Sequence, residues 1–196
     1  MCSVLNRRML EGILTVVCPG VVCLLIGLVV YGVPAFYWRT PSFQFIMTGF
    51  LVGALVLIAQ RLSLVQFVGA VVLITVAMIM GTGSSSLRLI PRVVVLMSVL
   101  ACAVLVNVKV LPRVPQVRVI GKHLVWAVVF ILAHFLVGVI LLIIFRPENV
   151  TPHLLVYAKL AVLTGIGLGI GFKAQQWLVF MLNKGTSRGS VASDGG

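Results

Sequence analysis

Six long apolar runs occupy most of this chain and constrain its fold more than any other feature. They cover residues 13–36, 43–59, 62–80, 91–108, 124–145 and 154–172, and charged, proline or glycine residues bound them. A helix needs about 20 apolar residues to cross the hydrocarbon core of a bilayer. We therefore predict an all-α, polytopic integral membrane protein with six transmembrane helices.

The composition agrees with a membrane location. Apolar residues make up 61% of the chain and charged residues only 9%, whereas a water-soluble domain carries roughly a quarter charged residues. The chain has only three acidic residues, Glu11, Glu148 and Asp194, and none of them lies inside an apolar run. This distribution argues against carboxylate chemistry within the bilayer.

The second and third runs are separated only by Gln60 and Arg61. A single helix over 43–80 would be about 57 Å long at 1.5 Å per residue, nearly twice the hydrocarbon thickness of about 30 Å. We therefore expect two spans joined by a tight hairpin, although no glycine or proline marks a turn there.

The basic residues provide an independent test of the topology, because cytoplasmic loops carry an excess of Lys and Arg. With six spans and both termini cytoplasmic, the inner side holds ten: Arg7, Arg8, Arg61, Lys109, Arg113, Arg118, Lys122, Lys173, Lys184 and Arg188. The outer side holds four: Arg39, Arg88, Arg92 and Arg146. A topology with five spans would place five basic residues on the inner side and eight on the outer side, so the distribution of basic residues favours six spans.

This topology gives one six-helix transmembrane domain over residues 1–184. The remaining residues, 185–196, are rich in Gly and Ser and are expected to form a flexible tail. The first apolar run is about twice as long as the hydrophobic region of a signal peptide, so we expect it to stay as the first helix. We expect a multi-pass protein of the bacterial cytoplasmic membrane, with an organelle inner membrane as the alternative.

The predicted inner loop 109–122 is strongly basic. It reads KVLPRVPQVRVIGK and contains Lys109, Arg113, Arg118 and Lys122 without any acidic residue. Its prolines exclude a regular helix through the first half, so we expect an extended segment. Such a loop sets topology, and it also suits contact with anionic lipid headgroups or with a membrane-protein partner. We expect no nucleic-acid partner, because the chain has no stacking platform or folded basic domain.

Two ionisable residues within predicted spans are candidate substrate or polar contacts. Lys159 lies about 8 Å below the outer start of the sixth span, where it either snorkels outward or contacts an anion in an outward-facing cavity. His134 lies near the middle of the fifth span. It suits a hydrogen bond between helices, or alternatively a proton-relay or ligand role.

Glycine spacing predicts close helix packing. The sixth run contains TGIGLGIG, which pairs Gly165 with Gly169 and Gly167 with Gly171 as G-x-x-x-G motifs, and the second run contains a further pair. That further pair is Gly49 and Gly53. Such motifs allow two helix backbones to approach closely. The alternative for the sixth run is a locally unwound helix that lines a substrate cavity.

These features favour two functional classes and disfavour enzymes. We find no catalytic constellation, no metal-ligand spacing and no cofactor motif, and the four cysteines form no C-x-x-C pair. The first expectation is a transporter or substrate-capture membrane component for a small anionic or apolar molecule. The alternative is a non-catalytic membrane subunit or assembly factor that packs against a larger membrane partner or a second copy of itself.

Overall fold

The computed structural model describes residues 2–31, 41–81, 89–114, 122–145 and 150–191, and every element within them is helical. The helices are α1 (Cys2–Tyr31), α2 (Pro41–Arg61), α3 (Leu64–Gly81), α4 (Leu89–Leu105), η2 (Val106–Val110), η3 (Leu111–Arg113), α6 (Lys122–Phe145) and α7 (Val150–Val191). No strand occurs in these ranges, so the all-α class is confirmed for the part of the chain that the structure describes.

Four of the helices are long and apolar enough to cross a membrane. These are Arg8–Val30, Ile90–Arg113, Lys122–Phe145 and Val150–Leu182, while the apolar parts of α2 and α3, Ile46–Arg61 and Leu64–Met80, are shorter. Large apolar side chains such as Leu132, Leu136 and Ile143 are exposed on the outside of the bundle. A soluble protein does not display apolar surface on this scale. The chain is therefore an α-helical membrane protein, whereas the count of six crossings stays a prediction.

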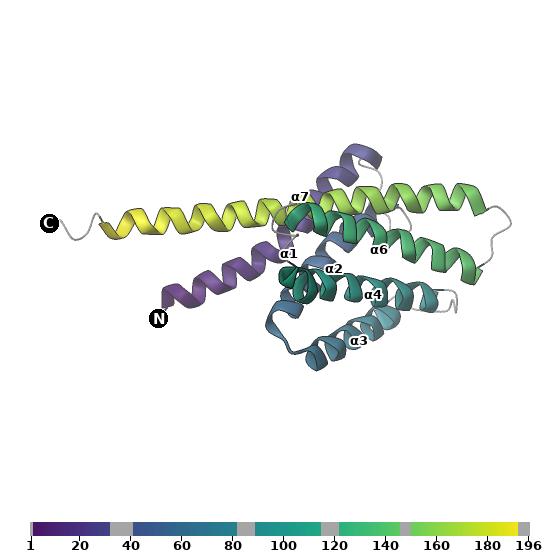
Figure 1. Cartoon of the computed structure of the whole chain (residues 1–196), viewed down its shortest axis with the longest axis horizontal. Coiled ribbons are helices and arrows are strands. Elements are labelled where there is room, and N and C mark those ends of the chain that lie inside the picture. The colour runs from purple at the N-terminus through teal and green to yellow at the C-terminus, as the bar shows by residue number, and fades with distance from the viewer. Residues whose placement is uncertain (1, 32–40, 82–88, 115–121, 146–149, 192–196) are drawn as a thin grey trace.

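The helices form a bundle in which α3 is peripheral. The closest pairs are α1 with α2 and α6 with α7, while α1 also packs along α7. α4 contacts α2, α3 and α6, so it closes the bundle opposite α1. Figure 1 shows α3 at the edge of the molecule, and both chain ends lie on the same side.

The turn between α2 and α3 consists of two residues, Leu62 and Ser63, as the predicted hairpin requires. Ser63 caps α3, because its Oγ accepts a hydrogen bond from the Gln66 backbone N–H at 3.4 Å and the Gln66 Oε1 accepts one from the Ser63 N–H at 3.2 Å. This reciprocal pair is a capping box. It starts α3 directly after the turn, so the turn needs no glycine or proline.

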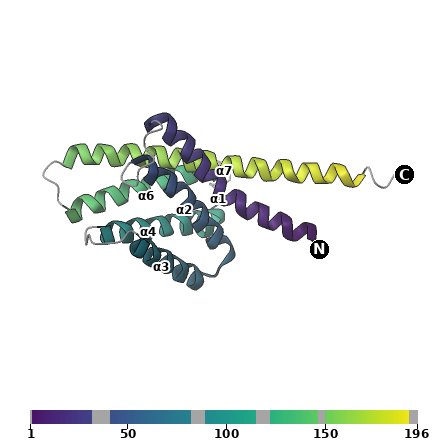
Figure 2. The ribbon, with the colours of Figure 1, turned by 180° about the vertical axis from the view of Figure 1, so that it is seen from behind.

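α1 packs between α2 and α7 at Pro19. A Cβ added to Gly171 of α7 would lie 2.6 Å from the Pro19 Cα, and a Cβ added to Gly49 of α2 would lie 2.9 Å from the Pro19 carbonyl oxygen. Proline within a helix removes one backbone hydrogen bond and favours a kink. Figure 2 shows α1 changing direction where it crosses α7.

α4 does not end at the start of the basic loop, which corrects the expectation of an extended segment from residue 109. Its axis continues through the π-helix η2 and the 3₁₀-helix η3 as far as Arg113. Pro112 has no N–H to donate to Val108, and its ring crowds that carbonyl. The preceding turn is widened, and the Leu111 N–H bonds instead to the Val106 carbonyl.

α7 is longer than predicted from the apolar run 154–172. Its 42 residues correspond to about 63 Å at 1.5 Å per residue. The helix includes residues 185–191, which we expected in a flexible tail. In Figure 1 the C-terminal part of α7 extends well past the other helices.

Candidate functional site

The end of the bundle that carries the chain termini is rich in positive charge. Arg61 at the end of α2 donates from Nη2 to the Arg8 carbonyl oxygen of α1 at 2.9 Å. Lys122 at the start of α6 and Lys173 on α7 both lie close enough to act on His123 electrostatically. We call this region, defined by Arg8, Arg61, Lys122 and Lys173, the basic end.

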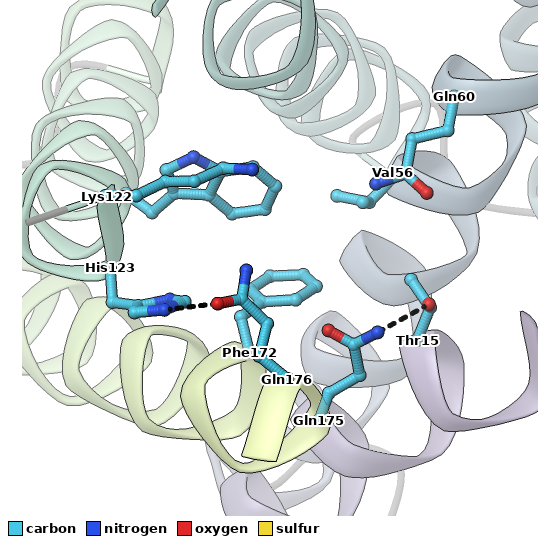
Figure 3. Close-up of a pocket in the computed structure, with 9 residues that line it drawn as sticks. Thr15, Val56, Gln60, Lys122, His123, Phe172, Gln175 and Gln176 are labelled. Atoms are coloured by element: carbon cyan, nitrogen blue, oxygen red, sulfur yellow. Dashed lines mark hydrogen bonds between the residues drawn. The ribbon is translucent and has the colours of Figure 1, made fainter. Parts of the chain in front are cut away.

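A small polar cavity opens at the basic end. Four helices line it through Thr15, Val56, Gln60, Lys122, His123, Trp126, Phe172, Gln175 and Gln176 (Figure 3). Its volume is about 30 Å³, and a water-sized group needs about 10–15 Å³ on this measure. The cavity therefore has room for about two such groups, far less than the roughly 300–1,000 Å³ of a pocket that encloses a whole small molecule.

Two interhelical hydrogen bonds fix the polar wall. His123 Nε2 donates to the Gln176 Oε1 at 2.8 Å, which joins α6 to α7. Gln175 Nε2 donates to the Thr15 Oγ1 at 3.3 Å, which joins α7 to α1, and Thr15 itself donates to the Glu11 carbonyl oxygen. Because the Gln176 oxygen is occupied, its amide nitrogen is turned toward the cavity, as Figure 3 shows.

Trp126 contributes a second donor to the cavity wall. Its side chain is only 4% exposed and packs edge-on against Phe172, with 4.7 Å between the ring centres. The indole Nε1 is buried and has no hydrogen-bond partner in the described part of the chain. Since buried polar groups are almost always paired, this N–H is a donor that lacks its acceptor.

The charge on the cavity wall is positive. The Lys122 Nζ lies 5.5 Å from the centre of the Trp126 ring, within the range of a cation–π interaction. Lys122 and His123 also begin α6, where the helix dipole presents its positive end. The residues that line the cavity include no carboxylate. The arrangement thus offers donors and positive charge to a small anionic group.

The two candidate contacts from the sequence do not line this cavity. Lys159 is exposed on α7 toward the opposite end of the bundle. His134 lies within α6, and its Nδ1 donates to the Phe130 carbonyl oxygen of its own helix at 3.3 Å. The hydrogen bond of His134 is therefore local, not the interhelical bond that we expected.

The glycines of the predicted packing motifs lie at helix contacts. An added Cβ would lie 2.7 Å from the Thr15 carbonyl oxygen at Gly53, and 2.9 Å from the Ala127 Cβ at Gly169. Gly165 likewise faces Ile131 and the Ala127 carbonyl, so one glycine pair of α7 packs on α6, while Gly171 packs on α1. The remaining glycine of the motif, Gly167, is buried. α7 is regular helix throughout this stretch and is not unwound.

The described residues of the basic loop lie on η2, on η3 and at the start of α6. Lys109, Arg113 and Lys122 are exposed, and Arg118 lies outside the described residues. Of the four, only Lys122 reaches the cavity.

Sequence reasoning missed the glutamines of the site. Gln175 and Gln176 lie just past the sixth apolar run, after Lys173 and Ala174. An adjacent glutamine pair after an apolar run was a visible signal of a polar helix face. Their partners, Thr15 and His123, lie far away in the sequence and become neighbours only through the packing of α7 on α1 and α6.

Comparison with known proteins gives no assignment. No protein-family model, no curated protein and no solved structure matches the chain. The fold and the cavity define an α-helical membrane protein with a polar, positively charged site at one end.

Proposed function

We propose that this protein is a non-catalytic membrane subunit or assembly factor that binds a partner protein through the projecting end of α7. The observation that carries the proposal is the length of α7 together with what it exposes past the bundle. A span over Val150–Leu182 has 33 residues, or about 50 Å of helix, against a hydrocarbon core of about 30 Å.

The polar wall of the cavity supports a position of the membrane boundary near Gln175 and Gln176. Beyond it, α7 continues to Val191 and exposes Trp177, Phe180, Met181 and Leu182. Trp177 suits the headgroup region, but the following residues extend further from the bilayer with each turn. Exposed apolar side chains outside the hydrocarbon core are typical of a protein-binding surface.

The charge of this region favours an acidic partner surface. Lys173 is exposed on α7 beside the projecting end, and Lys109 and Arg113 are exposed at the end of α4. Complementary charge speeds association and suppresses wrong partners. A helix end with exposed apolar side chains and basic residues beside it fits an apolar groove with an acidic rim.

A photo-crosslinking pair tests the docking proposal in the native membrane. We expect p-benzoylphenylalanine in place of Phe180 to give a discrete protein adduct, and the same group in place of Ile170 to give lipid adducts. The two side chains have similar exposed fractions, 60% and 51%. Ile170 lies on the bundle side of Gln175 and Gln176, where we place the membrane boundary, whereas Phe180 lies beyond it. Mass spectrometry of the adducts distinguishes a foreign partner from a second copy of the chain. Lipid adducts alone at both positions would contradict the proposal.

The membrane and the orientation belong to the same proposal. We place the protein in a bacterial cytoplasmic membrane, or an organelle inner membrane, with the basic end and both termini facing inward. With Cys2 replaced by serine, a cysteine in place of Glu148 should react with an impermeant maleimide in intact cells. A cysteine in place of Lys184 should react only after permeabilisation, and the reverse pattern would overturn the orientation.

Substrate capture or transport is the second candidate, and the polar cavity is the observation that favours it. A cavity of about 30 Å³ holds one small polar group of a molecule, not a whole substrate. Capture of a small anionic group fits its donors and positive charge better than capture of an apolar molecule. This role predicts a bound small molecule on the purified chain without any protein partner.

A further inference from the structure

We propose that the cavity at the basic end binds the phosphate group of a ligand that reaches it at the level of the lipid headgroups. The proposal rests on the cavity itself and is independent of docking by α7. If the protein acts in substrate capture or transport, the second candidate function, the proposal names the class of its ligand as a molecule with a phosphate group.

The cavity wall contains a hydrogen-bond donor without an acceptor in the described part of the chain. The Trp126 indole N–H is buried in the cavity wall without an acceptor. A buried donor that makes no hydrogen bond lowers the stability of the folded protein. An oxygen atom in the cavity would satisfy it. The Gln176 amide nitrogen, turned toward the same space because its oxygen accepts from His123, supplies a second donor.

The cavity wall also carries positive charge. Lys122 lines the cavity, and α6 begins there with the positive end of its dipole. No lining residue carries a carboxylate to neutralise that charge. A ligand oxygen that bears negative charge is therefore preferred over the oxygen of a neutral water molecule, because hydrogen bonds to charged acceptors are about twice as strong.

The size and the position of the cavity suit part of a phosphate group. Room for about two water-sized groups matches two oxygen atoms of one oxoanion, with the rest of the ligand outside. The side chains of Arg61 and Lys173 lie at the same end of the bundle, where the bilayer presents lipid phosphates. The Gln175 oxygen is an acceptor on the wall, and it suits a hydroxyl of a protonated phosphate or of a glycerol headgroup.

The test uses the full chain, purified and delipidated in detergent. Native mass spectrometry measures retention of phosphatidylglycerol against diacylglycerol, which lacks the phosphate. Calorimetric titration with inorganic phosphate, with chloride as control, measures the free anion. We expect Trp126→Phe to weaken binding roughly 10- to 100-fold, as loss of one hydrogen bond to a charged group predicts. Phe135→Leu, a change within the same helix α6 at a side chain that does not line the cavity, should leave binding unchanged.

Trp126→Phe alters a buried contact and can therefore affect folding as well as binding. Gln176→Glu is a second variant that avoids this problem. It keeps an acceptor for His123, replaces the amide donor with a carboxylate oxygen and leaves an exposed position otherwise intact. We expect it to abolish binding with no change in circular dichroism.

Each outcome decides the proposal. Retention of phosphatidylglycerol that both cavity variants reduce supports a lipid source, and the same dependence with inorganic phosphate supports a free phosphate ligand. Equal binding by Trp126→Phe, Gln176→Glu and Phe135→Leu would overturn the site, as would absence of binding by the unmodified chain. A crosslink from position 180 is unaffected in either case, so failure of the two proposals is distinguishable.

Discussion

Gly53→Ala is expected to destabilise the bundle by about 1–3 kcal/mol, the usual cost of overpacking a tight interface. An added Cβ would lie 2.7 Å from the Thr15 carbonyl oxygen and 2.8 Å from the Val16 Cα. Both are backbone atoms of α1, which cannot rotate away as a side chain would. The helices must separate to admit a single methyl group.

Gly69→Ala is the matched control. It makes the same chemical change on α3, but nothing lies within 4 Å of its added Cβ. Because Ala is favoured over Gly in a helix interior by up to ~1 kcal/mol, this variant should be neutral or stabilised. Unfolding in mixed micelles, followed by far-UV circular dichroism, measures both. Equal changes at the two positions would show that the α1–α2 contact is looser than the structure has it.

Asn107→Leu is expected to stabilise the protein by about 1–3 kcal/mol, the typical penalty of a buried unsatisfied polar group. Asn107 is 0% exposed, and neither its Oδ1 nor its Nδ2 has a hydrogen-bond partner in the described ranges. Leucine has the same number and branching of side-chain heavy atoms, so it removes the polarity with little change of shape.

Asn107→Asp provides the opposite change at the same site. It places an ionisable group where nothing pairs with it, and we expect strong destabilisation. The same micelle unfolding assay compares the two variants. If Asn107→Leu proved as harmful as Asn107→Asp, the amide would have a partner that the isolated chain does not contain. Since π-helical turns such as η2 often occur at functional sites, that result would direct attention to the end of α4.

The local features of the fold follow largely from the sequence. Apolar runs predicted the helical class and the membrane location, because every backbone group in lipid must be satisfied within the helix. The α2–α3 turn was placed correctly by the length argument, although its actual signal, Ser63 followed by Gln66, went unused. The end of α4 was misjudged, because Pro112 widened the helix instead of stopping it.

The candidate site shows the limit of such reasoning. Lys159 and His134 stood out because ionisable residues are costly in a bilayer, yet neither lines the cavity. Lys122 was singled out for its charge, and it does line the cavity. In the sequence, however, nothing distinguishes it from the other three basic residues of the loop. Gln176 and Trp126 become parts of one site only through neighbours on other helices, and no local pattern in the sequence brings the two together.

The sequence by itself determined the helical class and the apolar character of a membrane protein, because hydropathy acts residue by residue along the chain. The tertiary structure decided which helices touch: α1 lies between α2 and α7 because their glycines admit its backbone at Pro19. That packing places Thr15, His123, Gln175 and Gln176 around one cavity. Interhelical contacts depend on the shapes of surfaces far apart in the chain, and only their assembly makes the site.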